Sequence, residues 1–189
     1  VNSITFSQDS QWLVSGSDDK TVRLWNVYDH KDPKKNKILI LEEGPVFNVT
    51  FSFDNQLLAS CYDNRVCLWE VYCPNSHSSK TDTLSISCYL DLIHTTKVYV
   101  VAFSPDKKWL ASGSKGYTCL WNLTYPNKNQ TLTEHNESVL SVTFSQDNEW
   151  LASGSFTKII FWNKESSENI HAWGKKFIVK TNFNLYSIT

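Results

Sequence analysis

One segment of this chain is written four times, and this repetition constrains the fold more than any other feature. The first copy reads SITFSQDSQWLVSGSDDKTVRLWN, and its echoes are NVTFSFDNQLLASCYDNRVCLWE, VVAFSPDKKWLASGSKGYTCLWN and SVTFSQDNEWLASGSFTKIIFWN. Two aromatic positions mark the copies, namely Phe6, Phe51, Phe103 and Phe144, and then Trp25, Trp69, Trp121 and Trp162. Both series advance by about 41 to 52 residues, a period that is typical of propellers and solenoids. The chain is therefore built from copies of one structural unit.

Each copy divides into three short runs that are separated by turn residues. The first run has the form V-x-x-[VI]-x-F-S and ends in a polar turn such as Gln8-Asp9-Ser10, where Asp favours a turn by bonding to the backbone. The second run is W-L-[AV]-S-G-S, and the third, which ends at the Trp, is rich in β-branched and aromatic residues. None of the four copies has apolar residues at the spacing of an amphipathic helix. Fourth strands are expected between the copies, at 38–41, 85–93, 130–133 and 169–173.

A four-stranded antiparallel sheet of this kind buries neither of its faces alone. Stacking successive sheets around an axis covers both faces, and each large apolar side chain contributes roughly 1.5–3 kcal/mol when fully buried. We therefore expect an all-β chain, with 1–189 forming a single β-propeller segment made of four-stranded blades. The repeats are expected at about 1–41, 46–93, 98–133 and 139–173, with 174–189 beginning a further copy.

The composition excludes several other classes of protein. Hydrophobic residues make up 41% of the chain, which argues against disorder, and the formal net charge of −1 provides no basic field for nucleic acid. No apolar stretch is long enough to cross a membrane, so we expect an intracellular protein, cytoplasmic rather than membrane-bound. A zinc site at Cys73 and His77 is disfavoured because the sequence offers no second pair of ligands.

The pattern V-x-x-V-x-F-S-x-D…L-A-S-G-S…L-W-[DN], present in four copies, resembles the WD-repeat β-propeller family over most of the chain. The resemblance implies that a His before the first strand, a Ser in the second, an Asp in the next turn and the Trp tie each blade together. It assigns these roles to Ser15, Asp19 and Trp25; Ser60, Asp63 and Trp69; His94, Ser112 and Trp121; and His135, Ser153 and Trp162.

No copy carries the full set of four residues. Lys115 and Phe156 stand at the Asp position of copies three and four, and Glu42 stands at the His position of copy two. The chain is thus expected to be a divergent member. Propellers of this family commonly close with about seven or eight blades, so we expect either a missing remainder or completion by another chain.

The sequence contains no catalytic signature of the G-x-S-x-G, P-loop, G-x-G-x-x-G or H-E-x-x-H type. The sequence therefore predicts no enzyme activity, cofactor, metal or small-molecule substrate. We expect a protein-interaction scaffold or complex subunit that presents its loops to other proteins. The alternative is a regulatory or sensor WD-repeat domain of a larger signalling protein whose catalytic part lies outside this segment.

The resemblance assigns the loops near the propeller axis to a candidate protein-binding face. Those loops contain Asp18, Lys20, Asn64, Arg65, Lys97, Lys115, Tyr117, Phe156 and Lys158. Arg and aromatic residues are enriched in binding hot spots, and an apolar ring at Phe156 requires either burial or a partner. Ordinary solvated loops, with Phe156 folded inward, remain the alternative. A nucleic-acid contact through the lysines of 28–37 is disfavoured because that stretch lacks interleaved aromatic residues.

Overall fold

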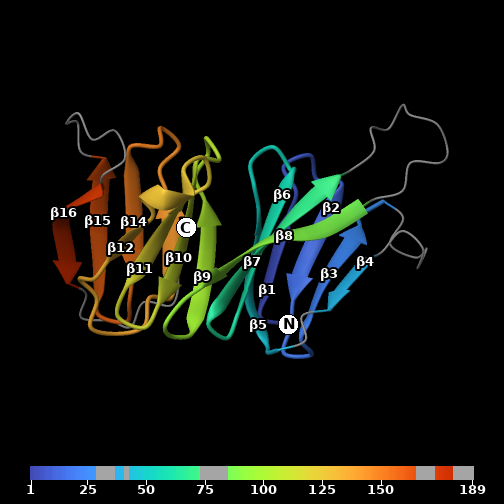
Figure 1. Cartoon of the computed structure of the whole chain (residues 1–189), viewed down its shortest axis with the longest axis horizontal. Coiled ribbons are helices and arrows are strands. Elements are labelled where there is room, and N and C mark those ends of the chain that lie inside the picture. Colours follow the sequence, from blue (N-terminus) through green and yellow to red (C-terminus); the bar gives the residue numbers. More distant parts are fainter. Residues whose placement is uncertain (29–36, 41–42, 73–84, 165–172, 181–189) are drawn as a thin grey trace. The chain divides into compact units, whose positions relative to one another are not determined.

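The computed structural model of the chain describes residues 1–28, 37–40, 43–72, 85–164 and 173–180. In these residues the chain forms sixteen β-strands and one short 3-10 helix, and the strands make four antiparallel sheets of four strands each (Figure 1). Each sheet corresponds to one copy of the sequence repeat. The predicted all-β class with four-stranded blades is therefore confirmed. The stretch 181–189, which was predicted to belong to a further copy, lies outside the described residues.

The chain divides into two compact units, Val1–Ile93 and His94–Thr189, with two sheets in each. The first unit contains β1 (Ser3–Phe6), β2 (Trp12–Gly16), β3 (Thr21–Asn26) and β4 (Lys37–Ile40), then β5 (Val46–Phe51), β6 (Leu57–Tyr62), β7 (Arg65–Tyr72) and β8 (Ser85–Ile93). The second contains β9 (Val98–Phe103), β10 (Trp109–Ser114), β11 (Thr118–Asn122), the 3-10 helix η1 (Pro126–Lys128) and β12 (Gln130–Leu132), then β13 (Ser141–Phe144), β14 (Trp150–Gly154), β15 (Lys158–Lys164) and β16 (Trp173–Lys180). Within each sheet, neighbouring strands follow the order of the sequence. The expectation of one domain over 1–189 stays a prediction.

The turn between the first two strands of each sheet is closed by its own side chains. In the first sheet Ser7 Oγ donates to Asp9 Oδ1 at 2.5 Å, and this carboxylate oxygen accepts from the backbone N–H of Gln11 at 3.0 Å. The backbone N–H of Trp12 donates to Ser7 Oγ at 2.9 Å. The same three contacts recur at Ser52 and Asp54, Ser104 and Asp106, and Ser145 and Asp147. The polar turns read from the sequence are thus Asx-type turns, which fix where the second strand begins.

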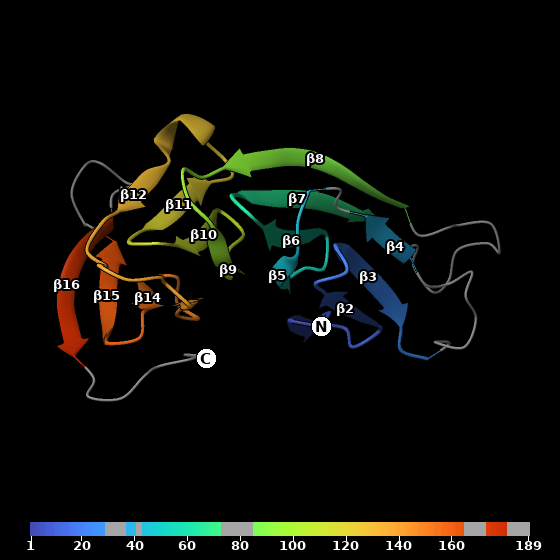
Figure 2. The same ribbon diagram turned by 90° about the horizontal axis from the view of Figure 1, so that it is seen from below.

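The two sheets of a unit pack with their first strands side by side. In the first unit β1 lies beside β5, and in the second β9 lies beside β13. The outer strands β12 and β16 lie at the side of the second unit away from β9 (Figure 2). A Cβ atom added to Gly16 would lie 2.6 Å from Val46 Cγ1, and one added to Gly113 would lie 2.7 Å from Val139 Cγ1. The glycine of the W-L-[AV]-S-G-S run is therefore required at these two positions because a valine side chain at or just before the first strand of the next sheet approaches its backbone closely.

Each unit has its own apolar core. In the first unit the core includes Leu24 and Leu58, both fully buried, together with Trp12 and Phe51. In the second unit it is built around Trp173. The centroid of the Trp173 ring lies 5.7 Å from that of Phe144 and 6.2 Å from that of Trp109. Both pairs have the edge-to-face geometry that aromatic rings prefer. The strands thus bury the face that the repeat pattern marks as apolar.

The outer strand of the fourth sheet differs from the expectation. A fourth strand was predicted at 169–173, whereas β16 begins at Trp173 and runs to Lys180. It pairs with β15 from Lys164 opposite Trp173 to Lys158 opposite Lys180, with a shift in register between Phe161 and Trp162. The segment 174–180, assigned to a further copy, therefore belongs to this sheet, because its pairing with β15 satisfies the backbone hydrogen-bonding groups on one side of the strand. The stretch 169–172 lies outside the described residues.

Candidate interaction surface

Every sheet contains a hydrogen bond from the repeat Trp on its third strand to the repeat Ser on its second. The indole Nε1–H donates to the hydroxyl oxygen in all four cases. The donor–acceptor distances are 3.0 Å for Trp25 and Ser15, 2.9 Å for Trp69 and Ser60, 2.6 Å for Trp121 and Ser112, and 2.8 Å for Trp162 and Ser153. The indole N–H is a donor that needs an acceptor when the ring is buried. These bonds hold the second and third strands of each blade in one register.

In the second unit a buried histidine extends this contact. His94 Nε2 lies 2.8 Å from Ser112 Oγ, and His135 Nε2 lies 2.8 Å from Ser153 Oγ. Both side chains are only 4% exposed, and burial lowers the pKa of each imidazole to about 4. Both rings are therefore neutral at pH 7. The loop before the first strand of each of these sheets is thereby anchored to the second strand.

Asp19 and Asp63, the residues at the Asp position of the first two copies, lie in turns at the surface. The Asp19 carboxylate accepts from Thr21 Oγ1 at 2.6 Å, from the backbone N–H of Thr21 at 3.1 Å and from Arg23 at 3.1 Å. The hydrogen bond from the Thr21 hydroxyl lowers the pKa of Asp19, although partial desolvation opposes this effect. Asp63 is also exposed and has a φ of 42°, in the left-handed region. These bonds of Asp19 join its turn to the strand that follows.

The fourth sheet lacks the Asp that the family pattern places in the turn after its second strand. Phe156, which stands at the Asp position, is half-buried. His135 Nδ1 is buried and has no hydrogen-bond partner among the described residues. A buried polar atom without a partner is destabilising, so the fourth sheet retains the Trp–Ser–His contacts with one unsatisfied nitrogen.

The candidate residues of the first unit are partly engaged with neighbouring side chains. Asp18 accepts from Asn2 Nδ2 at 2.7 Å. Arg65 Nε lies 3.0 Å from Glu43 Oε2, and the same guanidinium pairs with Asp91. Lys20 is exposed and Asn64 half-buried, each in the turn between the second and third strands of its sheet. The guanidinium of Arg65 therefore forms ion pairs with two carboxylates of its own unit.

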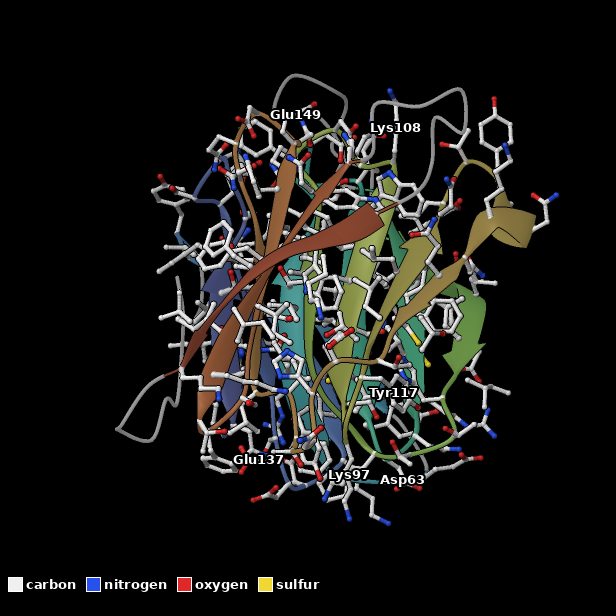
Figure 3. All side chains as sticks on the ribbon, turned by 90° about the vertical axis from the view of Figure 1, so that its left-hand side faces the viewer. Asp63, Lys97, Lys108, Tyr117, Glu137 and Glu149 are labelled. Carbon is white, nitrogen blue, oxygen red and sulfur yellow. The ribbon has the colours of Figure 1, made fainter. Side chains whose placement is uncertain are left out.

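The candidate residues of the second unit gather at one end of the sheets. Lys97 and Tyr117 lie at the same end as Glu137, whereas Lys108 and Glu149 lie at the opposite end (Figure 3). The turns that carry the other candidates follow the second strands of the two sheets. Lys115, which is exposed, follows β10, Phe156 follows β14, and Lys158 is the first residue of β15, directly after the same turn as Phe156. We refer to Lys97, Lys115, Tyr117, Phe156 and Lys158 as the loop end of the second unit.

The side chains of the loop end differ in how freely they can meet another molecule. The Tyr117 ring stacks on His94 with centroids 5.7 Å apart, and its hydroxyl lies 2.9 Å from Thr95 Oγ1. Lys158 donates to the backbone carbonyl of Glu134. The ammonium of Lys97 lies 5.9 Å from the ring centroid of Tyr99. Tyr117 is therefore part of the anchored entry loop.

Sequence reasoning missed the acidic residues that share this end. Glu134 pairs with Lys175 at 2.8 Å, which lowers the pKa of the carboxyl group, and Glu137 accepts from Thr157 Oγ1 at 3.0 Å. The signal was present in the run Thr133-Glu134-His135-Asn136-Glu137, where two acids flank the anchoring His. The loop end is therefore a surface of mixed charge.

Among the residues that the structure describes, no three His, Cys, Asp or Glu side chains form a group that could hold a metal ion. The pair Cys73 and His77 lies outside the described residues, as do Lys31, Lys34 and Lys35. Within the same described part of the chain, no helix is long and apolar enough to cross a membrane.

The repeat, the blades and the Trp–Ser bonds define a class of protein. The family described as WD domain, G-beta repeat matches residues 1–26, 35–70, 86–122 and 126–163, which together make up most of the chain. The chain belongs to the WD-repeat family, which confirms the resemblance read from the sequence.

Similar proteins share the repeat at low identity. Striatin-4 of Mus musculus is 28% identical over 137 residues, which cover 65% of this chain and 17% of the relative. DDB1- and CUL4-associated factor 5 of Homo sapiens is 28% identical over 129 residues, which cover 65% of this chain and 12% of the relative. The SAGA complex/transcription factor TFIID complex subunit Taf5 of Schizosaccharomyces pombe is 33% identical over 82 residues, which cover 38% of this chain and 13% of the relative. The chain thus matches less than a fifth of the length of each of these proteins.

Proposed function

We propose that this chain is a non-catalytic interaction module, a scaffold or complex subunit of the cytoplasm that presents its loop end to other proteins. Membership of the WD-repeat family supports a protein-interaction role in general. The names of Taf5 and of the DDB1- and CUL4-associated factor describe subunits or associates of protein complexes. The absence of known catalytic motifs from the sequence supports a role without chemistry.

The observation that carries the proposal is the anchoring of the loop end. His94 and His135 tie both entry loops to the blades through Ser112 and Ser153. Side chains on anchored loops lose little conformational entropy when they bind, which favours affinity. Exposed lysines beside Glu137 suit a protein surface of mixed charge better than the uniformly negative surface of a nucleic acid.

A charge reversal at the loop end tests the proposal. The full-length protein carrying Lys97→Glu and Lys115→Glu is used to purify bound proteins, beside the unaltered protein. Lys108→Glu is the matched control, because Lys108 is an exposed lysine at the opposite end of the same unit (Figure 3). We expect a stoichiometric protein to be lost with the double variant and retained with the control. Failure to recover any stoichiometric protein, or equal loss in both variants, contradicts the proposal.

A second candidate is a regulatory or sensor domain within a larger signalling protein. It is favoured by one observation, namely that the relatives are several times longer than the matched segment. Sequencing the flanking coding region decides between the two, because a P-loop or kinase signature there would favour the regulatory domain.

A further inference from the structure

The hairpin of β7 and β8 brings two cysteines onto one face of the sheet. Cys67 pairs with Asp91 across the strands, and Trp69 pairs with Cys88. Cys67 and Trp69 are two residues apart on β7 and therefore point to the same face. A shift in register between Leu68 and Trp69 leaves Tyr89 as an extra residue on β8. Such a bulge changes the direction of nearby side chains. Cys88 lies diagonally across from Cys67 on the same face of the hairpin, close enough for its side chain to influence the pKa of the Cys67 thiol.

The two thiols have unequal access to solvent. Cys88 is exposed on β8, the outer strand of its sheet, whereas Cys67 is only 5% exposed. Burial raises the pKa of the Cys67 thiol to about 12, so this group is protonated at pH 7. An oxidant dissolved in water therefore meets Cys88 first.

The surroundings of Cys67 contain a group that can take its proton. The Cys67 Sγ donates to Asp91 Oδ1 at 3.7 Å, and Tyr62 Oη lies 3.8 Å from the same sulfur. Arg65 pairs with Asp91 and holds its carboxylate in place, while Glu43 binds the other side of the guanidinium. The buried thiol is thus poised between an exposed thiol and an oriented carboxylate.

We propose that Cys67 and Cys88 form a redox pair that closes to a disulfide when hydrogen peroxide oxidises Cys88. In the first step the Cys88 thiolate attacks one oxygen of the peroxide, the O–O bond breaks, and sulfenic acid and hydroxide are formed. In the second step Cys67 attacks the Cys88 sulfur, the S–O bond breaks, and the S–S bond forms. The Cys67 proton passes to Asp91 and then to the leaving hydroxide. The hydroxide of the first step takes up the proton that Cys88 released on forming its thiolate, so that the two thiols together reduce one peroxide to two waters.

The repeat itself provides a matched control for this chemistry. Cys119 occupies the same repeat position as Cys67, because each lies two residues before the Trp of its third strand. Cys119 faces Thr131 on the outer strand and contacts its hydroxyl at 3.8 Å. Cys61 lies between Asn48 and Val66 in its sheet and is fully buried. Neither β10 nor β12, the strands on either side of Cys119, contains a cysteine, so Cys119 has no second thiol across from it.

Peptide mapping tests the proposal on the whole chain. The protein is treated with hydrogen peroxide, its remaining thiols are alkylated, and it is digested with trypsin and chymotrypsin. Trypsin cuts after Lys80 and chymotrypsin after Trp69 or Tyr72, so Cys67, Cys73 and Cys88 fall on separate peptides. We expect a linked pair of peptides containing Cys67 and Cys88, lighter by two hydrogens and separated by dithiothreitol. Cys119 is expected to remain alkylated.

Two variants separate the steps of the reaction. In Cys67→Ala, we expect Cys88 to accumulate as sulfenic acid that dimedone traps, and then as sulfinic acid. In Asp91→Asn, trapping of the Cys88 sulfenic acid should keep its rate, whereas disulfide closure should slow by at least about tenfold, since the proton acceptor is lost. A disulfide from Cys88 to Cys73, a bond between two chains, or over-oxidation of Cys88 in the unaltered protein overturns the proposal.

Discussion

At the scale of single residues, the buried histidines of the second unit link the stability of the fold to pH. His135 is held neutral in a site where burial lowers its pKa to about 4, with the charge of Lys158 acting in the same direction. In the unfolded chain an imidazole titrates near 6.5. Between these two values the unfolded state binds more protons than the folded state, so stability falls as the pH falls from about 6.5 toward 4.

We therefore predict that His135 contributes a loss of roughly 3 kcal/mol in the free energy of unfolding between pH 7 and pH 4. Urea unfolding followed across this range measures it, and His135→Gln should remove this part of the pH dependence. Ser153→Ala is the control, because it breaks the same hydrogen bond and keeps the titrating ring. An imidazole of His135 that titrates near 6.5 in the folded protein, as seen by NMR, contradicts the prediction.

At the scale of the strands and turns, an asparagine in the first turn of a sheet joins that sheet to its neighbour in each unit. Asn148 Oδ1 accepts from the backbone N–H of Asp106 at 2.9 Å, which connects the first turn of the fourth sheet to that of the third. In the first unit Asn55 Oδ1 accepts from the backbone N–H of Gln8 at 2.7 Å, one position earlier in the turn. Both asparagines also have a φ of 62°, a conformation that Asn tolerates better than most residues. Each asparagine therefore allows the left-handed backbone of its own turn and also bonds to the turn of the neighbouring sheet.

Two substitutions of Asn148 separate these roles. Asn148→Gly keeps the positive φ and loses the bond to Asp106, so we predict a loss of about 0.5–1.5 kcal/mol. Asn148→Ala loses the same bond and adds strain of about 1–2 kcal/mol in the left-handed region. Thermal and urea unfolding of the two variants measure the difference. Equal stability of the two variants would show that the backbone there is not held in the left-handed region.

The repeat predicts some elements better than others for a physical reason. The second and third strands carry the Ser and Trp positions that bond to each other in every sheet, and the first strand carries the repeated V-x-x-[VI]-x-F-S run, so their bounds follow from the sequence. The outer strand carries no such motif, and in the fourth sheet its position depends on a register shift beside Trp162. Similarly, the Trp–Ser bonds follow from the family pattern, whereas the pairing of Arg65 with Glu43 depends on which loops meet.

At the scale of the whole molecule, burial is decided by which sheet covers which, and sequence position alone does not reveal this. Phe6 and Phe51 occupy the same repeat position, yet Phe6 is 57% exposed and Phe51 only 9%. Ile4 and Val49, two residues earlier, differ in the same way, at 63% and 2%. In the first unit, β5 packs against the preceding sheet through β1 and β2, whereas Phe6 and Ile4 lie on the uncovered face of β1.

This difference yields a prediction for a matched pair of variants. Phe51→Ala removes a ring from the core of the first unit and should lower the free energy of unfolding by about 3 kcal/mol. Phe6→Ala removes an exposed ring and should change it by less than about 0.5 kcal/mol. Urea unfolding of this 189-residue chain measures both. An equal loss of stability in the two variants would contradict the prediction, because such a loss requires another sheet to cover Phe6 in solution. If the loss for Phe6→Ala also grew with protein concentration, that sheet would belong to a second copy of the chain.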